Sequence, residues 1–160
     1  MSILTFHETF DNTIMAPHKV IGVVGSRRRD TKEDFELTKN KFFEIYKKYD
    51  RICSGLCPQG GDWFAVLIAL GFDWIEDKKE RERLNQRIRN DKTITYVIEP
   101  IWYPADWKNL GKAAGPIRNT DIAKTSDELI ACISPDRLGG TEDTIKKFEK
   151  IHKGKVSILV

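Results

Sequence analysis

The sequence lacks long hydrophobic runs, and it contains few cysteines and histidines. Its most apolar stretch, WFAVLIAL at 63–70, is far shorter than the ~20 residues of a membrane span. Of the three cysteines, Cys53 and Cys57 stand four apart with no histidine beside them, and Cys132 is distant. An odd number without metal-ligand spacing excludes a disulfide framework and argues against a zinc site. We expect reduced thiols and no metal.

A strong excess of one charge is also absent. The 160 residues include 27 Lys and Arg against 24 Asp and Glu, a formal net charge of +3, so composition makes nucleic acid an unlikely partner. The opening MSILTFHETF has neither the basic segment nor the apolar core of a signal peptide. These features predict a cytoplasmic protein with no membrane partner. With no repeat or linker, we expect one domain over 1–160 and no cofactor.

What is present is an alternation of apolar strand-like runs with helical segments. The run at 20–24 is apolar on both faces, which is typical of a central parallel strand, and the stripe at 32–49 has helical spacing. The pattern predicts an α/β fold: a Rossmann-like, doubly wound, mostly parallel five-stranded sheet with helices on both faces. The expected strands are at 20–24, 51–53, 93–100, 128–134 and 155–160, and the expected helices at 32–49, 63–70, near 114–125 and near 140–152.

Two segments stand outside this alternation. Residues 1–18 form an N-terminal extension, expected as an edge hairpin or a surface wrap. Residues 72–92 are dense in both signs of charge and predict a helical insertion. This insertion is either an exposed solvated helix or a helix facing RNA or DNA.

Four glycine-containing loops follow the predicted strands: GSRRR, SGLCPQGGD, ADWKNLGKAAGPIRN and LGGTEDT. Parallel strands gather such loops at their carboxyl edge, where ligands bind. Glycines allow close backbone approach, and the loops carry donors suited to an anion, so a phosphate-bearing ligand fits them. The candidate ligand-binding residues are Gly25, Ser26, Arg27, Ser54, Gly55, Gly60, Gly61, Asp62, Trp107, Gly115, Arg118, Asn119, Gly139, Gly140 and Thr141.

Several of these side chains have two interpretations. Asp62 either caps the helix that follows or accepts hydrogen bonds from a ribose. Arg118 stands at a helix start, where its guanidinium suits a carboxylate or a phosphate. Asn119 either caps the helix, orients Arg118 or reads the edge of a base. Trp107 is either a core residue or a stacking surface for a base.

Taken in order, the motifs GSR, SG followed by GGD, DW followed by GKAAGPIRN, and GT before a helix resemble the YspA-like branch of the SLOG superfamily. That Rossmann-like superfamily also holds the lonely-guy phosphoribohydrolases and the DNA-processing protein A family. The resemblance runs from about residue 20 to 160, apart from 72–92. It implies a nucleotide or nucleotide-derived ligand at the carboxyl edge of the sheet, a cytoplasmic location and a homo-oligomer.

The chain departs from these relatives at two places. The lonely-guy enzymes carry G-G-x-G-T-x-x-E, and Thr144 stands where their glutamate would fall. The loop at 54–62 is also one residue longer than the usual form. Candidate acids for a glycosidase are Asp62, Asp121 and Asp143.

Three functions therefore remain. The first is a nucleotide-ligand binding domain acting as sensor, carrier or sequestering protein. The second is a hydrolase that cleaves the N-glycosidic bond of a nucleoside phosphate or an ADP-ribose-like compound. The third, suggested by SGLCPQGGD and by the arginines at 27–29, is single-stranded DNA binding.

Overall fold

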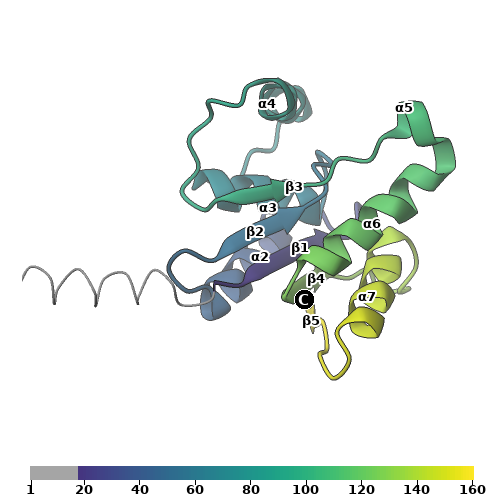
Figure 1. Ribbon diagram of the computed structural model, residues 1–160. Coiled ribbons are helices and arrows are strands. Elements are labelled where there is room, and N and C mark those ends of the chain that lie inside the picture. Colours follow the sequence, from purple (N-terminus) through teal and green to yellow (C-terminus); the bar gives the residue numbers. More distant parts are fainter. Residues whose placement is uncertain (1–17) are drawn as a thin grey trace, which may run out of the picture.

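The computed structural model describes residues 18–160, and within them the chain forms a five-stranded, all-parallel sheet in the order β3-β2-β1-β4-β5 (Figure 1). The strands are β1 (Val20–Gly25), β2 (Arg51–Ser54), β3 (Pro100–Trp102), β4 (Glu128–Cys132) and β5 (Ile158–Leu159). The helices are α2 (Lys32–Ile45), α3 (Gly61–Leu70), α4 (Lys78–Asn90), α5 (Trp107–Leu110), α6 (Ala114–Thr125) and α7 (Gly140–Ile151), with a 3-10 turn at Gly111–Ala113. This arrangement confirms the predicted Rossmann-like α/β class.

Helices cover both faces of the sheet. The pair α2 and α3 packs on one face, and the pair α6 and α7 packs on the other (Figure 1). The central strand β1 is therefore buried on both sides. Ile21 and Val23 join the core that includes Phe35 of α2, whereas Val24 joins the opposite core with Ile122 of α6. This double burial explains the continuous apolar run that marks β1 in the sequence.

Helix α2 ends at residue 45 rather than near 49. Thr31 caps its start by accepting a hydrogen bond from the Asp34 amide at 3.1 Å. After the helix, Asp50 accepts hydrogen bonds from the backbone amides of Lys47 at 2.9 Å and Lys19 at 3.1 Å. The buried carboxylate thus shapes a turn that leads directly into β2.

The expectation for the third strand was wrong in position, because the segment at 93–99 forms no strand and β3 begins only at Pro100. The backbone amides of Val97 and Ile98 donate to the Ala69 carbonyl at 2.9 and 3.2 Å. They thus satisfy one free C-terminal carbonyl of α3 instead of forming a sheet ladder. Ile98 is buried by this packing, so its apolar character serves a helix end rather than a strand.

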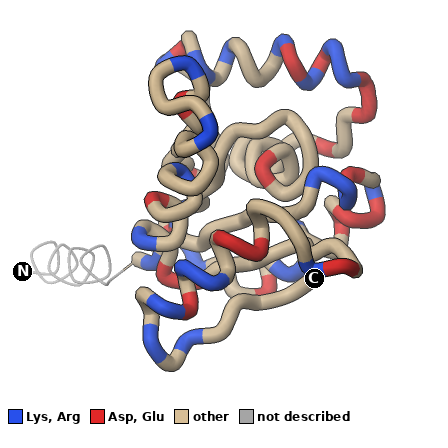
Figure 2. The backbone as a smooth tube through the Cα atoms, turned by 90° about the vertical axis from the view of Figure 1, so that its right-hand side faces the viewer, with Lys and Arg blue, Asp and Glu red and all other residues tan. Residues whose placement is uncertain are grey.

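The insertion at 72–92 is helical, as predicted, over the range of α4. It is not simply a solvated helix, because Arg81, Asn85 and Ile88 are buried on one face. The guanidinium of Arg81, 2% exposed, pairs with Asp30 at 2.8 Å in the loop after β1. Figure 2 shows Lys and Arg interspersed with Asp and Glu along α4 at the top of the view.

The predicted N-terminal extension at 1–18 lies outside the described residues except for its last position. In the part of the chain that the structure describes, no helix combines the length and apolar character needed to cross a bilayer.

Candidate functional site

A cavity of about 780 Å³ opens at the carboxyl edge of the sheet, between the ends of β1 and β4. After β1 the chain turns toward the face covered by α2, and after β4 it turns toward the face covered by α7. Ligands of doubly wound folds bind at this reversal of strand order. Among the candidate residues, the lining includes Gly25, Ser26, Arg27, Asp62, Trp107, Gly115, Arg118, Asn119, Gly139, Gly140 and Thr141.

The other candidates lie behind this lining. Gly60 and Gly61 bring the start of α3 against β1: a Cβ on Gly61 would lie 2.2 Å from the Gly25 nitrogen, and Gly60 has a φ of +67°. Gly55 gives room to Arg118, whose Nη1 would lie 2.2 Å from an added Cβ. Gly60 and Gly61 therefore serve close packing beneath the cavity, whereas Gly55 lines a smaller adjoining cavity.

Asp62 sits in a dense set of hydrogen bonds at the start of α3. Its Oδ1 lies 2.8 Å from Ser54 Oγ, which also lies 2.6 Å from the Val23 carbonyl oxygen. Its Oδ2 accepts from the Cys57 amide at 3.1 Å and from Arg118 Nη1 at 3.4 Å. Ser54 thus acts as a support for Asp62, and both oxygens of the carboxylate are already occupied.

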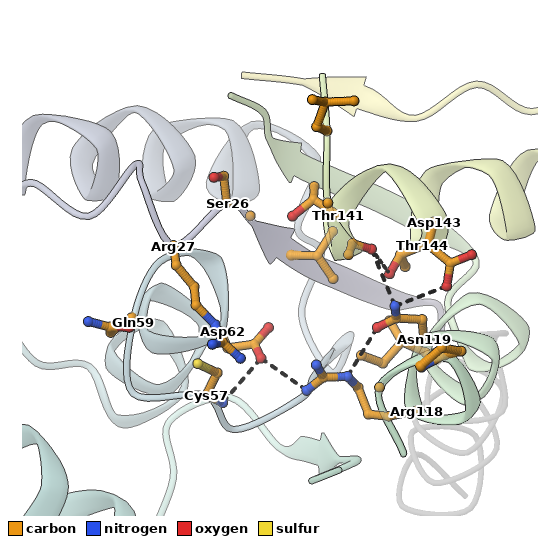
Figure 3. A pocket seen from close by; sticks show the side chains of 18 of the residues that line it. Ser26, Arg27, Cys57, Gln59, Asp62, Arg118, Asn119, Thr141, Asp143 and Thr144 are labelled. Carbon is orange, nitrogen blue, oxygen red and sulfur yellow. Dashed lines mark hydrogen bonds and ion pairs between the residues drawn. The ribbon is translucent and has the colours of Figure 1, made fainter. Parts of the chain in front are cut away.

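Arg118 and Asn119 continue this set across the cavity floor (Figure 3). Arg118 Nε donates to Asn119 Oδ1 at 3.1 Å, and Asn119 Nδ2 donates to Asp143 Oδ2 at 3.1 Å. Lys147 donates to the same Asp143 oxygen at 2.8 Å. The chain of contacts links the first turns of α3 and α7 to the second turn of α6, so these residues fix the shape of the site.

The candidate acids differ in their placement. Asp143 lines the cavity, whereas Asp121 is not among the lining residues. Partial burial alone would raise the pKa of Asp143, but hydrogen bonds from Lys147 and Asn119 outweigh it and hold that pKa below its ordinary value. Thr144, at the position of the lonely-guy glutamate, is buried and donates its hydroxyl to the Gly140 carbonyl at 3.1 Å.

The first turn of α7 presents a site suited to an anion. Gly139, its N-cap residue, has a φ of +110° and offers no side-chain hydrogen bond to the helix amides. Gly140 and Thr141 follow on the cavity wall. Free amides at a helix start carry partial positive charge, so this turn favours a phosphate or carboxylate oxygen.

Arg27 adds a full positive charge at the mouth. It is exposed and makes no hydrogen bond or ion pair with any residue in 18–160. Its neighbour Arg28, by contrast, pairs with Asp136 at 2.5 Å and donates to Ser134 at 3.0 Å. These contacts lower the pKa of Asp136, chiefly through the hydrogen bond from Arg28.

Trp107 forms one wall of the mouth and remains 53% exposed. A Cβ on Gly115 would lie 3.2 Å from Trp107 Cη2, so the missing side chain makes room for the indole ring. The small residues of GKAAGPIRN thus receive Trp107 against the first turn of α6. An exposed aromatic face at a cavity mouth is suited to stacking on a base.

The three cysteines are all free thiols. Burial raises the pKa of Cys53 to about 12, and burial also raises the pKa of Cys57, which lines the cavity. Within the described range, no cluster of three or more His, Cys, Asp or Glu side chains has an arrangement that would hold a metal ion.

Sequence reasoning missed several lining residues, namely Arg28, Cys57, Gln59, Pro116, Ile122, Asp136, Leu138 and Thr144. Arg28 and Asp136 are 108 positions apart, so no local sequence pattern indicates that they form a pair. Leu138 lies in the loop LGGTEDT, and a single exposed leucine in a loop is too common to indicate a site.

Comparison with known proteins gives no further guide: no family model matches the chain, and no curated protein or solved structure matches it significantly.

Proposed function

We propose that the chain binds a nucleotide or nucleotide-derived ligand at the carboxyl edge of its sheet, as a sensor, carrier or sequestering protein. The observation that carries this proposal is the cavity at the β1/β4 reversal, where the uncapped first turn of α7 and the unpaired Arg27 face one space. Its volume, about 780 Å³, falls in the range of small-molecule sites.

The lining divides into parts with different chemistry. The amides at Gly139 to Thr141 and the guanidinium of Arg27 favour phosphate oxygens. The ring of Trp107 and the side chain of Leu138 favour the flat apolar face of a base. A ligand with one anionic end and one aromatic end uses both parts, and a nucleotide has that form.

Binding without hydrolysis agrees best with the contacts of the carboxylates. Both oxygens of Asp62 accept hydrogen bonds from the protein, and Asp143 is held by Asn119 and Lys147. A general acid must offer a proton to the leaving group, and a carboxyl with a lowered pKa is ionised at neutral pH. Single-stranded DNA is not proposed, because Lys and Arg are interspersed with Asp and Glu along the backbone shown in Figure 2.

Membership of the YspA-like branch of the SLOG superfamily belongs to the same proposal, and so do a homo-oligomeric state and a cytoplasmic location. Light scattering coupled to size-exclusion chromatography measures the oligomeric state directly. The ligand class supports the location, because nucleotides are made and used in the cytoplasm.

The test is thermal stabilisation by a panel of adenosine, AMP, ADP, ADP-ribose and cyclic nucleotides, followed by chromatography of each incubated mixture. A ligand of the native state alone raises the midpoint in proportion to its occupancy. We expect the phosphate-bearing compounds to raise it and adenosine to have little effect. Arg27→Met should reduce the shift in midpoint. Arg83 is an exposed residue of α4, and Arg83→Met should leave the shift unchanged.

Two results would contradict the proposal. The absence of a shift with every nucleotide at millimolar concentration would exclude this ligand class. A new peak of free base after incubation would instead establish hydrolysis and replace binding by catalysis.

A further inference from the structure

A second cavity of about 280 Å³ adjoins the first and reaches Arg89 near the C-terminal end of α4. We call it the side lobe, and it is defined by Arg27, Arg89, Arg118, Gln59 and Trp107. Arg27, Gln59, Trp107 and Arg118 also line the main cavity, so the two spaces share a wall. A ligand held in the main cavity therefore has a direct path into the side lobe.

Three guanidinium groups line the side lobe, and no carboxylate does. Arg118 has a partner in Asp62, with 3.4 Å between Nη1 and Oδ2. Neither Arg27 nor Arg89 forms an ion pair with any carboxylate in the described chain. The space thus carries a net positive charge, which favours an anionic group within it.

Arg89 is held in position by neutral acceptors. Its Nε donates to Asn85 Oδ1 at 2.8 Å, and its Nη2 donates to the Leu56 carbonyl at 3.1 Å. Asn85 donates to the same carbonyl at 3.0 Å. A guanidinium fixed in this way loses little conformational freedom on binding a phosphate and keeps N–H groups for it.

The loop that these contacts hold is itself strained. Leu56 has a φ of +59°, which a leucine rarely adopts and which its surroundings must stabilise. Asn85 and Arg89 supply two hydrogen bonds to its carbonyl. Helix α4 is therefore part of the wall of the site, and it adds Arg89 to the arginines at 27 and 118 that come from the loop after β1 and from α6.

We propose that the side lobe binds a second phosphate group of the ligand, so that the preferred ligand is a nucleotide with two or more phosphate groups. This inference rests on the proposed nucleotide binding. One phosphate lies at the first turn of α7, and the second lies among Arg27, Arg89 and Arg118. The role of α4 is then to select such ligands over nucleoside monophosphates.

The test compares AMP, ADP and adenosine 3′,5′-bisphosphate by isothermal titration calorimetry with the wild-type chain, Arg89→Met and Arg83→Met. At least one ligand with two phosphates should bind the wild type about tenfold more tightly than AMP, as one charge-assisted contact implies. Arg89→Met should remove this advantage and leave the affinity for AMP unchanged. Arg83→Met, on the same helix but outside the lining, should behave as wild type.

Equal affinity for all three ligands, or an advantage that survives Arg89→Met, would overturn the inference while nucleotide binding itself stands. If no nucleotide binds, inorganic pyrophosphate tests the side lobe alone. Pyrophosphate that binds the wild type and not Arg89→Met would support the side lobe although the proposed function has failed. Pyrophosphate that binds neither chain, or both equally, would overturn it.

The apo midpoint of Arg89→Met shows whether the variant folds, since it also removes a contact to Leu56. Should it not fold, Arg27→Met replaces it in the ratio of ADP to AMP affinity. Arg27 lines both cavities, so its loss should weaken both ligands, and only a smaller ratio supports the side lobe. An unchanged ratio would overturn the inference.

Discussion

Arg118 Nη1 lies 3.4 Å from Asp62 Oδ2, and this ion pair joins the second turn of α6 to the first turn of α3 across the carboxyl edge of the sheet. The two side chains are 14% and 11% exposed. A charge so little exposed to water needs its partner, because loss of one member leaves the other desolvated and uncompensated. The pair is therefore a structural part of the site as well as a part of its lining.

Arg118→Ala should lower the free energy of unfolding by about 2 kcal/mol, because it leaves the Asp62 carboxylate without its cation. Urea denaturation measures the loss. Adding Asp62→Asn to this variant removes the unpaired charge and should recover part of the stability. If the double variant loses, relative to the wild type, the sum of the losses of Arg118→Ala and Asp62→Asn measured singly, the two residues are not coupled.

Gly61→Ala should destabilise the fold by about 3 kcal/mol, because the new methyl group would lie 2.2 Å from backbone atoms of Val24 and Gly25. The matched control is Gly140→Ala at the start of α7. There the nearest atom, Asn119 Nδ2, is 3.7 Å away, so the change should be nearly neutral. Equal urea midpoints for the two variants would mean that α3 does not need its close approach to β1.

Acid should destabilise the protein partly through Asp50. Burial alone would raise the pKa of this carboxyl, but hydrogen bonds from Lys19 and Lys47 outweigh it and hold the pKa below its ordinary value of 3.8. The unfolded chain therefore takes up the proton at higher pH than the folded chain, and the stabilisation is lost as the pH falls below about 4 and through the folded pKa.

Asp50→Asn should consequently show a smaller loss of unfolding free energy between pH 6 and pH 3 than the wild type. Urea titrations at a series of pH values give both curves. Asp73→Asn, at an exposed position without contacts in the described chain, should reproduce the wild-type curve. Parallel curves for wild type and Asp50→Asn would show that Asp50 does not contribute to the acid dependence.

Cys57 should be the first cysteine to react with iodoacetamide, because it is partly exposed while Cys53 and Cys132 are buried. Its raised pKa makes the reaction slow at pH 7 and faster up to and beyond pH 9, as the thiolate forms. Peptide mass mapping identifies the site. A nucleotide in the cavity that Cys57 lines should slow the reaction, and equal rates with and without nucleotide would place the ligand elsewhere.

Much of the fold could be predicted from the sequence, because the burial of each element determines its pattern of apolar residues. The apolar run of β1 and the glycine that ends α3, Gly71 with a φ of +73°, mark their elements directly. The segment at 93–99 misled the prediction because β-branched residues are favoured wherever an extended chain is half-buried, including across a helix end. Periodicity within one segment does not say what the segment packs against.

The sequence of α4 contains a spacing that indicates a packed face, but the many charged residues around it obscure the pattern. Arg81, Asn85 and Ile88 are spaced by four and three, the spacing of one helix face, yet two of them are polar. Arg81 is buried because Asp30 pairs with it, and Asn85 because Leu56 accepts its amide. Partners distant in sequence make these polar positions interior, so no local count of apolar residues finds them.

The site was foreseen in part for a similar reason. The parallel topology brings the loops after the strands to one edge of the sheet, as expected from the sequence. Arg118, Asn119 and Trp107 line the cavity there. Which glycines face the cavity and which face another segment of backbone depends on the tertiary packing, and the local sequence does not reveal it. Ser54 and Gly61 accordingly proved to lie beneath the cavity.

The strand order has a consequence for how the protein is made. Central β1 emerges from the ribosome first among the strands, yet one of its two neighbours, β4, begins at Glu128 and pairs with Ile21. Until that late segment is synthesised, one edge of β1 has no partner, and the cavity between β1 and β4 has only one side. The cavity is therefore incomplete until β4 has been synthesised and has paired with β1.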